Sequence, residues 1–126
     1  MSCRYRDAEG ILRRDLLDAE AQDEAKALVQ ISTTQLRRFF EQVGAIKRRM
    51  EVDPSVSDGE ILAQAAFLKA SSYYAAARSR TNEAVKDFVI KHVDSIKARR
   101  DFLDFHRHFE AVVAFHRYFG KDEKGN

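Results

Sequence analysis

The chain has 126 residues, the size of a single domain with one hydrophobic core. It contains one proline, five glycines and no tryptophan, and alanine is frequent, which favours an all-α fold. Cys3 is the only cysteine, which excludes an internal disulfide framework and fits a reducing compartment. No apolar run reaches the roughly 20 residues of a membrane-spanning helix, and the N-terminus lacks an apolar signal core. We therefore expect a cytoplasmic protein without membrane contact.

Charge is distributed unevenly along the chain. The 22 basic and 20 acidic side chains give a net charge of +2. Basic side chains outnumber acidic ones in residues 31–50 and 61–100, whereas acidic ones are in excess in residues 1–30 and 51–60. A basic region is the electrostatic requirement for binding a polyanion such as RNA. The same pattern is also typical of ordinary solvated helix faces.

The first 30 residues carry the weakest structural signal. Residues 1–8 are polar and lack a helical pattern, and we expect them to be disordered. Residues 9–30 favour a helix, but its middle, AEAQDEAK, is acidic and has no large apolar side chain. We expect a weakly packed helix there, which could detach or pack against another copy of the chain.

The stretch 31–50 shows the clearest helical pattern. Ser32 precedes Gln35 by three residues, which is the capping-box spacing and predicts a helix over residues 33–51. Large apolar side chains follow at helical intervals on one face: Leu36, Phe39, Phe40, Val43, Ile46 and Met50. The other side carries Arg37, Arg38, Lys47, Arg48 and Arg49 against one acid, Glu41. This helix is predicted to bury its apolar face and to present a basic face to solvent.

The helical pattern breaks at residues 52–60, VDPSVSDGE. Pro54 restricts the residue before it and so ends the preceding helix. Ser57 and Glu60 repeat the capping-box spacing and predict a second helix over residues 58–80. Seven alanines in that helix would let neighbouring helices approach closely, and we place it in the centre of a bundle.

Tyr73 and Tyr74 in the helix 58–80 have two interpretations. Aromatic side chains form stacking platforms for the bases of single-stranded nucleic acids. The alternative is that both rings pack in the core with their hydroxyl groups at the surface.

Two further helices complete the predicted bundle of about five. The first follows a cap at residues 81–82 and reaches about Asp94. The second begins at Lys97 or Arg99, is rich in phenylalanine and is expected to end at Gly120. We expect residues 121–126 to be disordered and residues 1–126 to form a single domain.

The last helix contains three histidines, but their spacing does not predict a metal site. Ligands on one helix must share a face, commonly four residues apart. His106 and Glu110 have that spacing, whereas His108 lies about 160° around the axis from Glu110. We expect a hydrogen bond between His106 and Glu110, and no metal. No zinc-protease motif, phosphate-binding glycine loop or nucleophile elbow is present, so we expect no catalytic residues and no cofactor.

Three segments together resemble one protein family. They are TTQLRRFFEQV at 33–43, LKASSYYAAARSR at 68–80 and DFLDFHRHFEAVVAFHRYF at 101–119. In order and spacing they are similar to the small helical subunit of the type III-A CRISPR effector complex, the Csm small-subunit family. The matching residues are Thr34, Gln35, Arg37, Lys69, Tyr74, Arg78, Phe105, Phe109, Glu110, Ala111, Phe115 and His116.

The resemblance implies a helical bundle that stacks in several copies along a guide RNA–target RNA duplex, beside other Csm subunits. It implies contact with the target strand and no catalytic activity, since cleavage belongs to neighbouring subunits. A basic helix face suits this role, because base pairing reads the sequence while the protein reads shape and phosphate.

We expect the phosphate contacts to come from six basic side chains: Arg37, Arg38, Lys47, Arg48, Lys69 and Arg78. Motif and charge agree for Arg37 and Arg78. In one alternative, Glu110 pairs with either arginine in the core and removes it from this set. In another, the protein is a helical self-associating scaffold without nucleic-acid contact, in which the acidic segment 7–24 docks on a basic face of the next copy.

Overall fold

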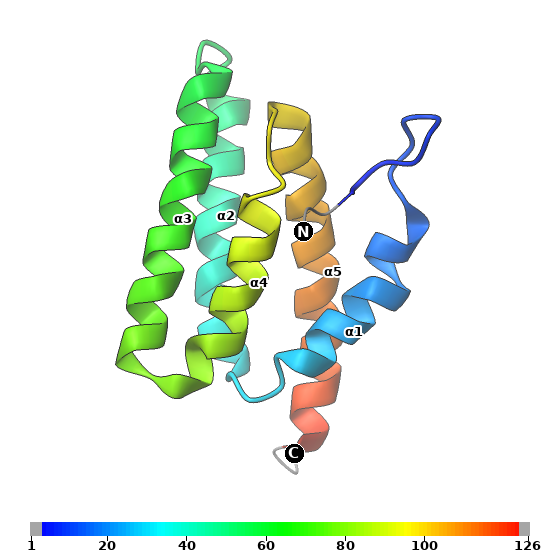
Figure 1. Ribbon diagram of the computed structural model, residues 1–126, viewed down its shortest axis with the longest axis vertical. Coiled ribbons are helices and arrows are strands. Elements are labelled where there is room, and N and C mark those ends of the chain that lie inside the picture. Colours follow the sequence, from blue (N-terminus) through cyan, green and yellow to red (C-terminus); the bar gives the residue numbers. More distant parts are fainter. Residues whose placement is uncertain (1–3, 124–126) are drawn as a thin grey trace.

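The computed structural model describes residues 4–123, and side chains as far as residue 120 (Figure 1). Cys3 therefore lies outside the described residues, as do residues 124–126. Within the described part the chain is all-α, as predicted. The α-helices are α1 (Ala19–Ala27), α2 (Thr33–Val52), α3 (Asp58–Arg78), α4 (Glu83–Val93) and α5 (Arg99–Glu123), with short 3-10 helices η1 (Arg14–Leu17) and η2 (Arg80–Asn82).

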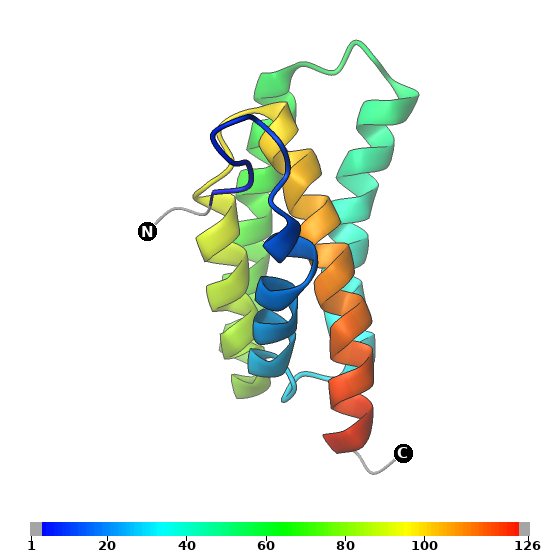
Figure 2. The same ribbon diagram turned by 90° about the vertical axis from the view of Figure 1, so that its right-hand side faces the viewer.

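The long helices lie roughly parallel or antiparallel to one another, with α3 beside α2 and α4, and with α1 on the outer side of α5 (Figures 1 and 2). The helix with the most extensive contacts is α5, which packs against α1, α2 and α3. The prediction that the alanine-rich helix α3 lies in the centre is wrong. Only one side of α3 is buried, and Phe67 on its other side is 69% exposed.

Both predicted helix starts are confirmed. The Ser32 Oγ accepts a hydrogen bond from the backbone N–H of Gln35 at 3.0 Å, which caps α2. The Ser57 Oγ accepts one from the N–H of Glu60 at 3.2 Å, which caps α3. Each cap of this kind stabilises its helix by about 1 kcal/mol, because it satisfies a backbone donor that the helix leaves without a partner.

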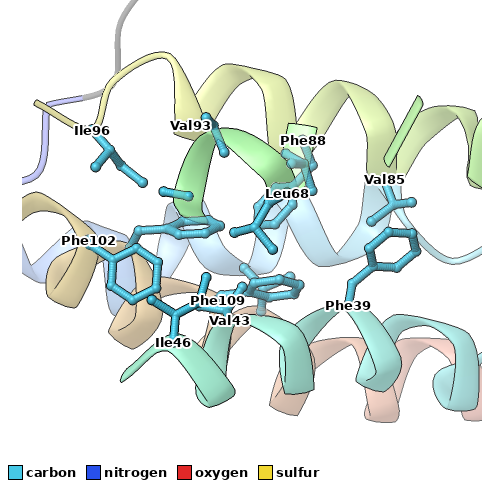
Figure 3. Close-up of a cluster of buried hydrophobic side chains, with 14 of the residues drawn as sticks. Phe39, Val43, Ile46, Leu68, Val85, Phe88, Val93, Ile96, Phe102 and Phe109 are labelled. Carbon is cyan, nitrogen blue, oxygen red and sulfur yellow. The ribbon is translucent and has the colours of Figure 1, made fainter. Parts of the chain in front are cut away.

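The core is shared by all five α-helices, and Figure 3 shows a part of it in which α2, α3, α4 and α5 meet. The apolar face predicted for α2 is confirmed, with Phe40 only partly buried. Phe102, Phe105 and Phe109 of α5 are fully buried. The ring centroid of Phe109 lies 4.9 Å from that of Phe88 of α4 in an edge-to-face contact. Such pairs add to the stability that burial of the rings supplies.

The last helix continues beyond its predicted end. Gly120 does not stop α5, which runs to Glu123 and so covers residues 121–123 that we expected to be disordered. Gly120 is buried, and a Cβ atom placed there would lie 3.6 Å from the His116 ring. The glycine therefore sits against its own helix and is not a left-handed cap, and its φ angle is not positive.

The N-terminal segment 4–8 has specific contacts, in contrast to the expected disorder. Tyr5 is 3% exposed, and its hydroxyl lies 2.9 Å from the His92 Nδ1. The Arg6 guanidinium donates two hydrogen bonds of 2.8 Å to the Asp104 carboxylate of α5. The chain then turns at Gly10, whose φ of 80° is readily adopted only by glycine.

Segment 9–30 also packs more closely than its composition suggests. It is not one helix but η1 followed by α1. Ala21 and Ala25 are fully buried, since small side chains let α1 approach α5 closely. Larger apolar groups flank the acidic middle and are buried as well: Leu16, Leu28 and Ile31.

Candidate nucleic-acid interface

The basic face of α2 is exposed as predicted. Arg37, Arg38 and Arg48 are exposed, and none of them forms an ion pair with a described residue. Leaving a cation without a partner costs little in water, where ion pairs at exposed sites contribute roughly 0–1 kcal/mol. These three guanidinium groups are therefore available to a ligand.

Arg38 and Arg78 line the same groove, which lies between the N-terminal half of α2 and the C-terminal half of α3. The groove has a volume of about 320 Å³. Its other polar lining residues are Gln35, Gln42, Ser71, Tyr74, Ser79 and Asn82. No acidic residue lines it, so the groove combines two cations with neutral hydrogen-bonding groups.

Tyr74 presents its ring beside this pair of arginines. The side chain is 66% exposed, and the guanidinium carbon of Arg78 lies 5.7 Å from the ring centroid, which is cation–π distance. Tyr73 is 53% exposed and lies under the Lys86 ammonium group. The interpretation of these tyrosines as core residues is therefore wrong.

Lys47 and Arg48 lie in a second groove, between α2 and α5, where acids accompany them. The Lys47 Nζ lies 2.7 Å from a carboxylate oxygen of Glu51, and this hydrogen bond lowers the pKa of Glu51. Glu41 and Glu110 line the same groove. The positive potential there is weaker than in the groove between α2 and α3.

Lys69 is separated from the other basic residues. Its Nζ lies 2.6 Å from the Asp94 carboxylate, and this hydrogen bond raises the pKa of Lys69. Nine residues separate Lys69 from Arg78, which places them on opposite sides of α3 at about 100° per residue. The six predicted phosphate contacts thus do not form one continuous surface.

The alternative role of Glu110 is wrong. Glu110, Arg37 and Arg78 are all exposed, and no ion pair joins them. The hydrogen bond expected between His106 and Glu110 is also absent, and the buried Nδ1 of His106 has no hydrogen-bond partner among the described residues. Burial lowers the pKa of His106, and the nearby Lys47 lowers it further.

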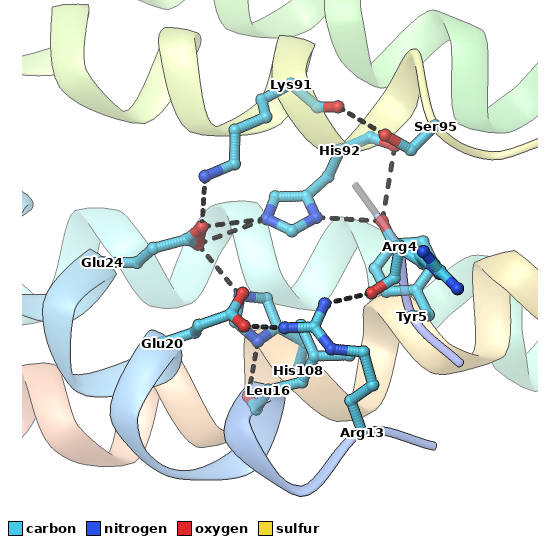
Figure 4. Close-up of polar contacts among 10 residues, drawn as sticks. All are labelled: Arg4, Tyr5, Arg13, Leu16, Glu20, Glu24, Lys91, His92, Ser95 and His108. Carbon is cyan, nitrogen blue, oxygen red and sulfur yellow. Dashed lines mark hydrogen bonds and ion pairs between the residues drawn. The ribbon is translucent and has the colours of Figure 1, made fainter. Parts of the chain in front are cut away.

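Reasoning within single helices missed a buried polar cluster of Glu24, His92 and His108 (Figure 4). The three side chains come from α1, α4 and α5, so no spacing within one helix could reveal it. Burial would raise the pKa of Glu24, but hydrogen bonds from both histidines and from Lys91 outweigh it and hold that pKa far below its usual value. Burial lowers the pKa of His92 despite its hydrogen bond to Glu24.

Comparison with known proteins identifies the family. The family model described as Csm2 Type III-A matches residues 12–122, which is most of the chain. Searches of curated protein sequences and of solved structures found no match. Among residues 4–123, no helix has both the length and the apolar character that crossing a membrane requires. The chain therefore belongs to the Csm2 family and is the small structural subunit of a type III-A CRISPR complex, which associates with the other Csm subunits.

Proposed function

We propose that this Csm2 family member binds the backbone of the target RNA through the groove between α2 and α3. In this proposal several copies stack along the guide–target duplex and act in the cytoplasm, while catalysis belongs to other subunits. The observation that carries it is the pairing of Arg38 and Arg78, which line one groove free of acids beside the exposed ring of Tyr74.

The chemistry of the groove suits a nucleic-acid backbone. A guanidinium group donates two parallel hydrogen bonds to a phosphate and keeps its charge at any physiological pH. Tyr74 can stack on a base of any identity, because every base has an aromatic face. Neither contact reads sequence, which fits a complex in which the guide RNA supplies specificity by base pairing.

The other four basic residues have secondary roles in this proposal. Arg37 and Arg48 extend the positive surface along α2 towards α5. Lys47 and Lys69 already form ion pairs, at 2.7 and 2.6 Å respectively. Such exposed pairs are weak, so a phosphate can compete for either lysine.

The test is a titration of target RNA into the reconstituted complex at several salt concentrations. It compares the wild-type subunit with the double variant R38E/R78E. A protein that loses two phosphate contacts should show a salt slope lower by about 2 and weaker binding at every salt concentration. The matched control is R14E/R107E, which makes the same charge change at exposed arginines outside the groove.

The two variants separate a local contact from a general effect of charge. Equal losses in R38E/R78E and R14E/R107E would show that only the net charge matters. Unchanged affinity and slope in R38E/R78E would mean that the groove does not contact RNA. Normal complex assembly by both variants is needed first, and gel filtration of the complex measures it.

A self-associating scaffold is the second candidate. The observation that favours it is Phe67, which is 69% exposed beside an apolar groove that Ile46 and Leu68 help to line. If this face joins copies, F67S should lower the sedimentation coefficient at high protein concentration and leave the RNA salt slope unchanged. A monomeric wild-type protein with normal RNA binding would exclude this candidate.

A further inference from the structure

Two buried histidines and a partly buried glutamate that the proposed RNA groove does not include converge inside the bundle (Figure 4). One ligand atom from each of Glu24, His92 and His108 lies within 4.8 Å of the other two. The histidine side chains are 1% and 0% exposed, and that of Glu24 is 15% exposed. We propose that these residues form a binding site for a divalent transition-metal ion, zinc being the simplest case.

Two of the three distances between the ligand atoms are close to those of a zinc site. The Oε2 of Glu24 lies 3.2 Å from the His92 Nε2 and 2.9 Å from the His108 Nε2. Ligand atoms bound at about 2.0–2.2 Å in a tetrahedron lie roughly 3.3 Å from one another. The two histidine nitrogens lie within 4.8 Å of each other, so the rings must also move closer together before all three ligand atoms reach bonding distance.

Outer partners orient both histidine ligands. The His108 Nδ1 donates a hydrogen bond to the backbone oxygen of Leu16 at 2.6 Å, and the His92 Nδ1 lies 2.9 Å from the Tyr5 hydroxyl. Both rings thus direct Nε2 towards the carboxylate. Metal-binding histidines commonly donate their second ring N–H in this way, and the partner holds the ring in position.

The hydrogen bonds of His108 favour a proton or a metal ion between its Nε2 and the Glu24 carboxylate. With Nδ1–H donating to the Leu16 oxygen, a neutral ring carries no proton on Nε2. That nitrogen and the Glu24 Oε2 would then be two acceptors facing each other at 2.9 Å. Either a second proton or a metal ion resolves this conflict. A metal ion can also bind His92 in the tautomer whose Nδ1–H donates to the Tyr5 hydroxyl, because that tautomer leaves a lone pair on Nε2.

The ligand set selects the kind of ion. Two imidazoles and one carboxylate suit zinc and its neighbours in the first transition series, whereas calcium and magnesium prefer oxygen ligands. The positive charge of Lys91 would repel a metal ion, since its Nζ lies 2.7 Å from Glu24 Oε1. It approaches the oxygen other than the one nearest His108, so Oε2 remains the ligand atom. Glu24 and Lys91 also line an open groove of about 250 Å³, which gives an ion access.

A bound ion would join α1 to α4 and α5, because each of these helices supplies one ligand. It would fasten the N-terminal segment to the bundle at the point where Tyr5 already contacts His92. The site lies apart from the groove between α2 and α3, so RNA binding and metal binding can fail independently.

The test measures zinc uptake by the full-length protein after it has been stripped with a chelator. Isothermal titration calorimetry at neutral pH should show one zinc ion per wild-type chain and a rise in Tm on binding. E24Q keeps the size of the side chain and removes its charge, and H108Q removes a ligand; each should lower zinc affinity at least about 100-fold. H106Q is the control, since it changes a histidine of the same helix outside the cluster.

Because E24Q or H108Q could fail to fold, the test also includes a milder variant. Y5F removes only the hydroxyl group beside the His92 Nδ1, and it should weaken zinc affinity roughly tenfold. Cobalt bound to the wild-type protein should show the intense visible absorption of a tetrahedral site. Wild-type protein that takes up no more zinc than H108Q would overturn the proposal. So would a doubly protonated His108 ring in nitrogen NMR spectra recorded with zinc in excess.

Discussion

Two polar regions of this molecule differ in the exposure and the pairing of their charged groups. In the groove between α2 and α3, Arg38 and Arg78 are exposed and have no acidic partner among the described residues. In the cluster of Glu24, His92 and His108, every ligand atom faces another polar group, and the rings are buried. Water can solvate the first set, whereas the second must be satisfied inside the protein.

The groove between α2 and α3 is thus open to a binding partner, whereas the cluster of Glu24, His92 and His108 is expected to stabilise the fold. Unpartnered surface cations contribute little to stability, so their presence points towards a ligand. A buried charged group destabilises the folded protein unless a partner of opposite charge or a hydrogen bond compensates for its lost hydration. Removing one partner of a buried pair therefore lowers the free energy of unfolding. Substitutions in the two regions should therefore have different effects on stability and on RNA binding.

The largest effect is expected from E24A in metal-free protein. The change leaves His92 and His108 without their carboxylate partner in a buried site, and it should lower the free energy of unfolding by about 3 kcal/mol. Urea denaturation followed by circular dichroism measures this. A loss below about 0.5 kcal/mol would show that the cluster does not hold α1 in place.

A moderate effect is expected from Y74A, measured as affinity for target RNA in the reconstituted complex. Loss of one stacking contact should weaken binding by about 1–3 kcal/mol. The ring is 66% exposed, so the free energy of unfolding should change little. Y74F is the matched control, because it keeps the ring, and it should bind like the wild type. Equal binding by all three proteins would exclude stacking at this position.

The smallest effect is expected from R38Q/R78Q on stability. Neither guanidinium group has an acidic partner among the described residues, so the free energy of unfolding should change by less than about 0.5 kcal/mol. The same denaturation experiment as for E24A measures it. A decrease in the free energy of unfolding of more than about 1 kcal/mol would mean that the two arginines stabilise the fold.

The helices were largely predictable because their signals are local. Ser32 and Ser57 mark the starts of α2 and α3, and both caps are present. The apolar face of α2 is buried as its spacing predicts. The packing of the helices was not predictable in this way. Alanines allow close approach, but they do not determine which helix approaches, and the contacts of α5 are more extensive than those of α3.

The candidate groove was predictable only in part. Charge and motif both select Arg78, and charge selects Arg38. The spacing of nine residues already places Lys69 on the opposite side of α3 from Arg78, but the sequence does not show that Arg38 and Arg78 share a groove. That grouping depends on the register of α3 against α2. The ion pair between Lys69 and Asp94 joins α3 to the end of α4. The spacing of residues within one helix therefore cannot predict it.

Local sequence patterns were enough to predict the all-α class, the two capped helix starts, the apolar face of α2, and the family resemblance that the Csm2 match confirms. These depend on patterns within one helix or on local motifs. The tertiary structure alone decided the contacts of Tyr5, the division of the basic residues between grooves, and the meeting of Glu24 with His92 and His108. Those depend on distances between residues as many as 87 positions apart, which only the packing of the helices sets.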